Sequence, residues 1–186
     1  MGKLANTVII FISDNGHFAG HHRISSGKLS YYEESIRVPF MMRGPGIPAN
    51  TIRSQLVSNI DLAPTILDLA DTPASWATDG KSLLPLIQDA STPWRTAVFV
   101  DGFVRVDSDN PPKFNAVRTP RYLYVEHEIA SNDKEFYDLQ LDPFQLQNKA
   151  SDPAYADVRS NLQTKLDTLK TCAGVSCWIT GADLAP

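Results

Sequence analysis

Short, nearly unbroken apolar runs dominate the first half of this chain. Val8–Ile12 and Val38–Met42 are each five residues long and hold no charged side chain. Runs of this length and composition are typical of strands buried on both faces, because a helix of the same burial would be longer and periodic. Pro39 fits the start of the second strand, where a missing N–H is tolerated. We therefore predict two buried strands, followed by an edge strand over Ile52–Ser58.

A helical pattern follows these strands. Asn59–Ala70 is predicted to be a helix with Asp61 as its N-terminal cap and Pro64 in its first turn. A second, short helix is predicted over Leu84–Ile87. The apolar face of the first helix is expected to consist of Ile66, Leu67 and Ala70.

The second half of the chain changes to runs typical of antiparallel β-structure, separated by turn-rich segments. The expected strands are Ala97–Val106, Asn115–Thr119, Tyr122–His127 and Glu135–Leu139. His127 stands alone at a strand end, so we interpret it as structural or solvated. Ala90–Trp94 is small, polar and proline-bearing, which favours a boundary there. We therefore divide the chain into residues 1–92 and 93–186.

The last periodic segment predicts a helix over Pro153–Lys170, capped by Asp152 with proline at its first position. Its apolar positions recur at intervals of three and four residues, so one face should be buried. That face consists of Val158, Leu162, Leu166 and Leu169.

Composition limits the classes of function. The 186 residues are 42% hydrophobic and 20% charged, as in an ordinary globular protein, with a net charge of −4. Lys and Arg are outnumbered and do not gather on one face, so we expect no nucleic-acid partner. No apolar run approaches the roughly 20 residues that span a bilayer, so we expect no membrane partner. The first residues lack a separate apolar segment with a cleavage site, so the sequence predicts no signal peptide.

A polar turn, Ser13–Gly16, ends the first strand abruptly. In open α/β sheets, ligands bind beyond the carboxyl ends of the strands, and a carboxylate beside an amide oxygen suits Ca²⁺ or Mg²⁺. Asp14 and Asn15 are therefore candidate metal ligands, although Asp, Asn and Gly also dominate ordinary turns. The next twelve positions gather several histidines and cations, which by themselves indicate no more than a solvated basic loop. They are His17, His21, His22, Arg23 and Lys28.

Read together, these motifs resemble the sulfatases, most nearly the N-acetylglucosamine-6-sulfatase-like and related arylsulfatase-like enzymes. That family shows a hydrophobic strand, an SDNG or SDHG turn, a G-x-H segment, a lysine, Y-E-x-x-x-R-V-P and R-G-P-G-I in this order. The matching elements here are Ser13–Gly16, Gly20–His22, Lys28, Tyr32–Glu33, Arg37–Pro39 and Arg43–Ile47. The similarity continues through Phe136–Leu139 and Asp142–Pro143, with Gln145 where the family usually has Glu.

The resemblance implies an α/β fold. The first part of the chain would be the end of a sulfatase-like (alkaline-phosphatase-like) mixed sheet, belonging to the large catalytic domain. The second part would be a small C-terminal antiparallel sheet packed with a helix. Together they would correspond to about the C-terminal third to half of such an enzyme.

The resemblance also implies hydrolysis of a sulfate monoester, on a small molecule or a sulfated glycan. Asp14 and Asn15 would hold a divalent cation, usually Ca²⁺, with Mg²⁺ as an alternative. Lys28 would contact the sulfate and the leaving-group oxygen. His22, or less readily His21, would contact the sulfate or act as leaving-group acid. The nucleophile of the family is a formylglycine made from a Cys/Ser-x-Pro/Ala-x-Arg motif, which we expect to be absent from this chain.

The two cysteines, Cys172 and Cys177, lie just past the last helix. Zinc would require two more soft ligands, and a thioredoxin motif would require two intervening residues rather than four. We therefore expect a disulfide that closes a small loop, contributing about 2 kcal/mol. Such a bond suggests a parent enzyme that is exported or periplasmic.

Two alternatives stay open at this point. The superfamily also contains phosphodiesterases and phosphonate hydrolases, although the SDNG turn with a downstream lysine favours a sulfatase. Alternatively, the chain would be non-catalytic, either a truncated product or one half of a split protein that requires an N-terminal partner.

Overall fold

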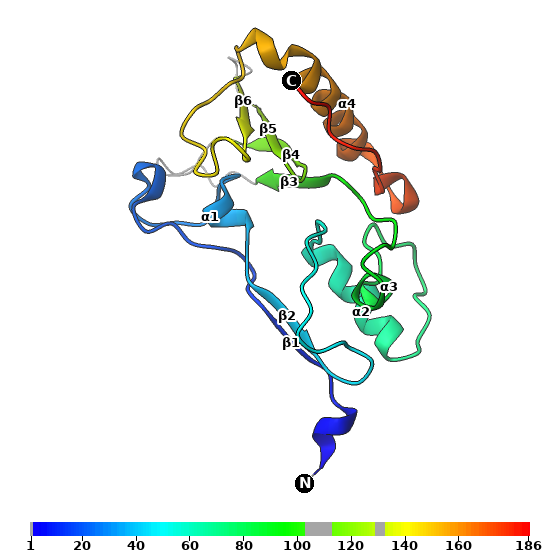
Figure 1. Cartoon of the computed structure of the whole chain (residues 1–186). Coiled ribbons are helices and arrows are strands. Elements are labelled where there is room, and N and C mark those ends of the chain that lie inside the picture. The colour runs from blue at the N-terminus through cyan, green and yellow to red at the C-terminus, as the bar shows by residue number, and fades with distance from the viewer. Residues whose placement is uncertain (1, 103–112, 129–132) are drawn as a thin grey trace.

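The computed structural model describes residues 2–102, 113–128 and 133–186. A short 3₁₀ turn, Lys3–Asn6, leads into β1 (Ile9–Ile12). A second, His21–Arg23, precedes α1 (Glu33–Ile36), after which the chain returns as β2 (Phe40–Arg43). The helices α2 (Leu62–Leu69) and α3 (Leu84–Gln88) follow. Figure 1 shows α2 and α3 together on one side of the β1–β2 pair.

The two apolar runs do form strands, but their environment differs from the prediction. β1 pairs antiparallel with β2 in a two-stranded sheet, with Phe11 opposite Met41. Both of these side chains are more than half exposed, at 56% and 60%, and Ile9 is 46% exposed. The expectation of strands buried on both faces in a mixed sheet is therefore wrong for this chain, because no further strand or helix of the described residues covers that face.

The predicted edge strand over Ile52–Ser58 is also wrong. The segment forms no strand, and side chains rather than a backbone ladder hold it in place. Arg53 donates from Nε to the Leu86 carbonyl (2.8 Å) and from Nη2 to the Ile87 carbonyl (2.6 Å), which occupies carbonyls at the end of α3.

The helix around Asp61 begins differently from the prediction. A 3₁₀ turn, Asn59–Asp61, precedes α2, and Ser58 is its N-cap in a capping box with Asp61. The Asp61 carboxylate therefore accepts the Ser58 N–H (2.9 Å) instead of capping α2 itself. Ile66, expected on the buried face, is 53% exposed, whereas Thr65 is fully buried.

The second half of the chain follows the predicted pattern. Four strands form an antiparallel meander in the order β3 (Val98–Gly102), β4 (Phe114–Arg118), β5 (Tyr122–His127) and β6 (Lys134–Asp138). Residues 103–106 of the first predicted strand lie outside the described residues. α4 (Ala156–Thr171), which a 3₁₀ turn from Pro153 introduces, packs along the sheet (Figure 1).

The two larger core clusters lie on the two faces of this four-stranded sheet, and a smaller one surrounds Leu83, Leu86 and Trp94. One face packs against α4 through its predicted stripe, Val158, Leu162, Leu166 and Leu169. On the other face, Tyr31 from the N-terminal half packs against Phe114, Leu123 and Tyr137. The sheet therefore anchors the segment that precedes α1. Because this segment directly follows the polar loop after β1, the sheet also fixes one end of that loop.

The expected disulfide is present between Cys172 and Cys177. It closes the turn after α4, in which the Gly174 N–H donates to Asp79 Oδ1 (2.6 Å) and Trp178 Nε1 donates to the Asp79 carbonyl (3.2 Å). The division at residues 92 and 93 stays a prediction, and contacts of this kind join the two sides of it. Within the described residues, no helix is long and apolar enough to cross a membrane.

Candidate functional site

The polar turn after β1 brings together two of the predicted site residues. Lys28 Nζ lies 3.7 Å from Asp14 Oδ2, although the residues are fourteen positions apart. Both side chains are solvent-accessible, at 53% and 81% exposed, so the ion pair by itself adds little stability. A metal-type carboxylate and the predicted sulfate-contacting cation therefore face each other at the end of the strand.

Local hydrogen bonds orient the turn. Asn15 Nδ2 donates to the Gly16 carbonyl (2.7 Å), and Ser13 Oγ donates to the Asn15 carbonyl (2.8 Å). A carbonyl only accepts, so the amide nitrogen of Asn15 is fixed as the donor and its oxygen is the atom that a cation would meet. Gly16 is required by close packing, because a Cβ at that position would lie 1.9 Å from the Glu34 carbonyl oxygen.

The donor set fits a hard cation only in part. Asp14 and Asn15 supply oxygen ligands of the type that Ca²⁺ and Mg²⁺ prefer. No group of three or more His, Cys, Asp or Glu side chains suited to a metal occurs among the described residues. Ca²⁺ takes six to eight oxygens, so any cation held here would need further ligands from water or from another part of the protein.

The histidine-bearing loop is closed at its base by a backbone contact at Phe18, which is 1% exposed. The Phe18 N–H donates to the Gly27 carbonyl (2.8 Å), which closes the loop at its base. His21 is exposed, and His17 Nε2 lies 3.4 Å from Ser26 Oγ, so neither is held against the body of the protein.

His22, in contrast, is fixed on three sides. Its ring stacks on Tyr32, with centroids 3.7 Å apart and planes at 5°, and the Phe18 ring lies edge-on to it, with centroids 6.3 Å apart. His22 Nε2 lies 3.5 Å from Glu34 Oε2. Its backbone is left-handed, with φ of 53°, as is that of Arg23, with φ of 62°. Left-handed residues other than glycine are uncommon, so surrounding contacts must hold this conformation.

Sequence reasoning did not identify Tyr32 and Glu34 as part of this site. The motif Tyr32-Glu33 marks the family, but its spacing from His22 gives no sign of stacking or pairing. Only the left-handed turn at His22 and Arg23 brings the ring onto α1.

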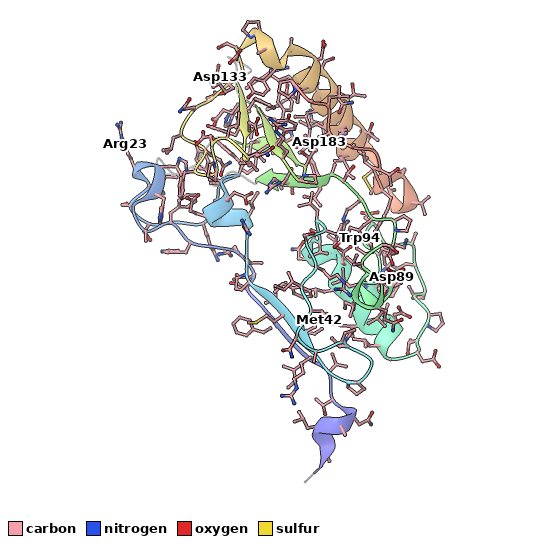
Figure 2. The ribbon with its side chains drawn as sticks, viewed as in Figure 1. Arg23, Met42, Asp89, Trp94, Asp133 and Asp183 are labelled. Carbon is pink, nitrogen blue, oxygen red and sulfur yellow. A yellow bond between two sulfur atoms is a disulfide. The ribbon has the colours of Figure 1, made fainter. Side chains whose placement is uncertain are left out.

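The expected absence of a Cys/Ser-x-Pro-x-Arg sequence is wrong as stated, because Ser91-Thr92-Pro93-Trp94-Arg95 fits that pattern. The structure gives these residues a packing role. Arg95 is 4% exposed and forms an ion pair with the fully buried Asp61, and Trp94 Nε1 donates to the Leu56 carbonyl (2.7 Å). Ser91 Oγ donates a hydrogen bond to the Asp89 carboxylate. Trp94 and Asp89 lie beside α3, well apart from Arg23 in the histidine-bearing loop (Figure 2).

The family model described as N-sulphoglucosamine sulphohydrolase, C-terminal, matches residues 20–172. The N-acetylglucosamine-6-sulfatases of Homo sapiens and Capra hircus are each 34% identical to the chain over 208 aligned positions. Those alignments cover 95% of this chain but 37% of each relative.

Solved structures match over a similar span. BT4656 in complex with its substrate D-glucosamine-2-N,6-O-disulfate has a TM-score of 0.85 at 29% identity, covering 91% of this chain and 35% of that one. The phosphonate monoester hydrolase of Agrobacterium radiobacter has a TM-score of 0.75 at 29% identity, covering 91% and 36%. The chain therefore spans little more than a third of the length of these four proteins, and the family model that it matches is that of a C-terminal part.

Proposed function

Because the chain belongs to the sulfatase family and corresponds to the C-terminal part of its members, we propose that it serves in the hydrolysis of sulfate monoesters. In this proposal it contributes cation ligands and substrate contacts, and a region outside these 186 residues contributes the nucleophile. The observation that carries the proposal is the meeting of Asp14 and Lys28 across 3.7 Å directly beside Asn15.

Each of these side chains has a role in the proposal. Asp14 and Asn15 would be ligands of a divalent cation, which when bound would act as Lewis acid toward a sulfate oxygen. The Lys28 ammonium would offset negative charge on the sulfuryl group and the leaving oxygen, which grows as the ester bond breaks. His22, held by Tyr32 and Glu34, would contact the sulfate or give a proton to the leaving oxygen.

The substrate class follows from the relatives. The similar mammalian enzymes are named N-acetylglucosamine-6-sulfatases, and the substrate of BT4656 is a sulfated glucosamine. We therefore propose a sulfated amino sugar, free or within a glycan, as the substrate of the parent enzyme.

Phosphonate monoester hydrolysis is the second candidate. It is supported by the TM-score of 0.75 to the Agrobacterium radiobacter enzyme, which is as identical to the chain, at 29%, as BT4656 is. The two functions differ in the ester that is turned over, so rates on a sulfate monoester and a phosphonate monoester distinguish them.

The test compares the chain alone with the chain combined with a formylglycine-bearing N-terminal region of a sulfatase. We expect the chain alone to give no hydrolysis of an aryl sulfate above buffer, because no activated nucleophile reaches Lys28. In the combined enzyme, Lys28→Ala should lower kcat/KM for the sulfate ester by on the order of 10²-fold or more, as loss of a charge-stabilising group does. Lys3→Ala, an exposed lysine in the 3₁₀ turn before β1 and so at the opposite end of that strand from the polar turn, is the matched control and should retain activity.

Two outcomes would contradict the proposal. One is turnover by the chain alone that Lys28→Ala abolishes, which would mean that catalysis needs no other region. The other is unchanged kcat/KM in the Lys28→Ala form of the combined enzyme. A preference for the phosphonate ester would favour the second candidate instead.

A further inference from the structure

A partly buried acidic group packs against the segment that follows the histidine-bearing loop and belongs to the other half of the chain. Glu135, on β6, has a side chain only 18% exposed, and its carboxylate receives several donors. Tyr31 Oη donates to Glu135 Oε1 (2.6 Å), Tyr137 Oη donates to Oε2, and His127 Nε2 lies 2.9 Å from Oε1. A carboxylate with this many partners is well satisfied, so it can fix the groups that point at it.

Tyr31, which is held by Glu135, in turn contacts Tyr32. Tyr31 Oη lies 3.5 Å from Tyr32 Oη, a long contact, and the one proton of Tyr31 goes to Glu135 at 2.6 Å. Their rings are 4.6 Å apart, and Tyr31 also packs edge-to-face on Phe114 of β4 at 5.0 Å. Tyr31 is 5% exposed, so its contacts with Glu135 and Tyr32 lie inside the protein.

Tyr32 in turn carries the imidazole of His22, through the parallel stack at 3.7 Å. The left-handed backbone of His22 is unfavourable on its own, so the stack and the Glu34 contact must hold it. The series of contacts therefore runs from Glu135 through Tyr31 and Tyr32 to His22.

We propose that Glu135 is a positioning residue for His22, acting through a platform that Tyr31 and Tyr32 form. The proposal rests on the proposed function only for the role of His22 as a substrate contact. In it, the small C-terminal sheet is more than a scaffold: its β6 carboxylate sets the orientation of a histidine on a loop more than one hundred residues earlier.

A spectroscopic test can be made on the whole chain without a ligand. An imidazole stacked on a phenol ring has its carbon-bound protons shifted upfield by the ring current, whereas exposed His21 provides an internal reference. We expect wild-type protein to show this upfield shift at His22. Tyr31→Phe, which keeps the ring and removes the hydroxyl, should move the His22 signals most of the way toward those of His21. Glu135→Gln should do the same.

The matched control is Tyr124→Phe. Tyr124 Oη donates to Glu126 Oε1 (2.9 Å) in the same sheet, but the ring belongs to the core beneath α4. This variant should leave the His22 signals unchanged. Should Glu135→Gln fail to fold, Tyr31→Phe decides the question. Unchanged His22 signals in a folded Tyr31→Phe protein would overturn the proposal.

A second arm separates this proposal from the proposed function. Glucosamine 6-sulfate is added to the wild-type chain combined with an N-terminal sulfatase region that lacks the formylglycine, so that the sugar binds without turnover, and the His22 signals are followed. A response in wild type that weakens in Tyr31→Phe supports both the platform and the substrate contact. With the platform confirmed but no response of His22 to the sulfate ester, the positioning of the ring stands and the substrate role of His22 is contradicted.

Discussion

At the scale of single residues, the polar turn has the composition of a metal site but only part of its ligand set. Asp14 and Asn15 are adjacent, and the Asn15 amide nitrogen donates to the Gly16 carbonyl, which leaves the amide oxygen as the acceptor. Two oxygens are far below the six to eight that Ca²⁺ takes. The cation affinity of the isolated chain should therefore report how incomplete the site is.

We expect calorimetry to show weak Ca²⁺ binding, with a Kd of about 1 mM, the range of the weakest protein calcium sites. Asp14→Asn should weaken it further, because it removes the only carboxylate of the pair. Asp157→Asn, an exposed carboxylate on α4, should leave it unchanged. Micromolar affinity in the wild-type chain would show that other ligands complete the site.

Glu135 makes a second prediction at the residue scale. Burial alone would raise the pKa of Glu135, but hydrogen bonds from His127, Tyr137 and Tyr31 outweigh it and hold the pKa below its ordinary value of 4.5. Burial and the neighbouring Glu135 raise the pKa of Tyr31, so its hydroxyl stays protonated as the donor. The carboxylate is therefore the charged acceptor throughout the neutral range.

A depressed carboxylate pKa stabilises the folded state above the unfolded pKa of 4.5, and this contribution is lost as the pH falls through the lower folded pKa. Wild-type protein should exceed Glu135→Gln in stability at pH 7, and the difference should shrink as the pH falls below 4.5. Urea unfolding followed by circular dichroism at several pH values measures it. A difference that stays constant with pH would mean that the charge of Glu135 contributes nothing.

At the scale of elements, α4 and the turn after it connect the two halves of the chain. The disulfide closes this turn and holds Gly174 so that its N–H meets Asp79. The ring of Trp178 packs edge-to-face on Trp94 at 4.9 Å, and Lys81 and Arg95 lie over it at 4.8 and 5.0 Å. Through these contacts the turn holds the loop that precedes α3 in place.

Replacing both Cys172 and Cys177 with Ser should lower the free energy of unfolding by about 2 kcal/mol, the loop-entropy value for so short a loop. The loss should appear as a lower urea midpoint under oxidising conditions. Val175→Ala changes a 91% exposed side chain in the same turn and should have no effect. An unchanged midpoint in the double Ser variant would show that the packing around Trp178 suffices without the bond.

At the scale of the whole molecule, the two halves differ in how fully they bury their apolar side chains. The four-stranded sheet has a buried cluster on each face. Of the large apolar residues that are exposed in the described part of the chain, ten lie in the first half and five in the second. Those of the first half include Ile9, Phe11, Met41, Ile60 and Ile66. Exposed apolar patches together with open strand edges favour association.

We therefore expect the isolated chain to self-associate through the β1–β2 face. Substituting Phe11→Ser and Met41→Gln together should weaken association roughly tenfold for each side chain, given about 1.5 kcal/mol per buried large apolar group. Leu146→Gln, which alters a 72% exposed side chain in the second half, is the control. Light scattering and hydrogen exchange decide the matter: a monodisperse monomer whose Ile9–Ile12 amides are as protected as those of α4 would contradict it.

The sequence alone determined those features that depend on local patterns. The spacing of Val158, Leu162, Leu166 and Leu169 was enough to predict α4 and its buried face, because helix periodicity is set by backbone geometry. The β-meander and the disulfide were predicted correctly for similar reasons. The ordered motifs from Ser13 to Ile47 also identified the family, which the comparisons confirmed.

Only the tertiary structure decided which distant groups meet. An apolar run does not specify its neighbours, so the antiparallel pairing of β1 with β2 was not predictable from it. The sequence Ser91–Arg95 matches the pattern of a nucleophile motif. Its arginine, however, is buried in an ion pair with Asp61 and therefore belongs to the core. The link from Glu135 to His22 depends on one sheet face and two left-handed residues, and neither leaves a periodic trace in the sequence, because long-range contacts follow from packing rather than from local preference.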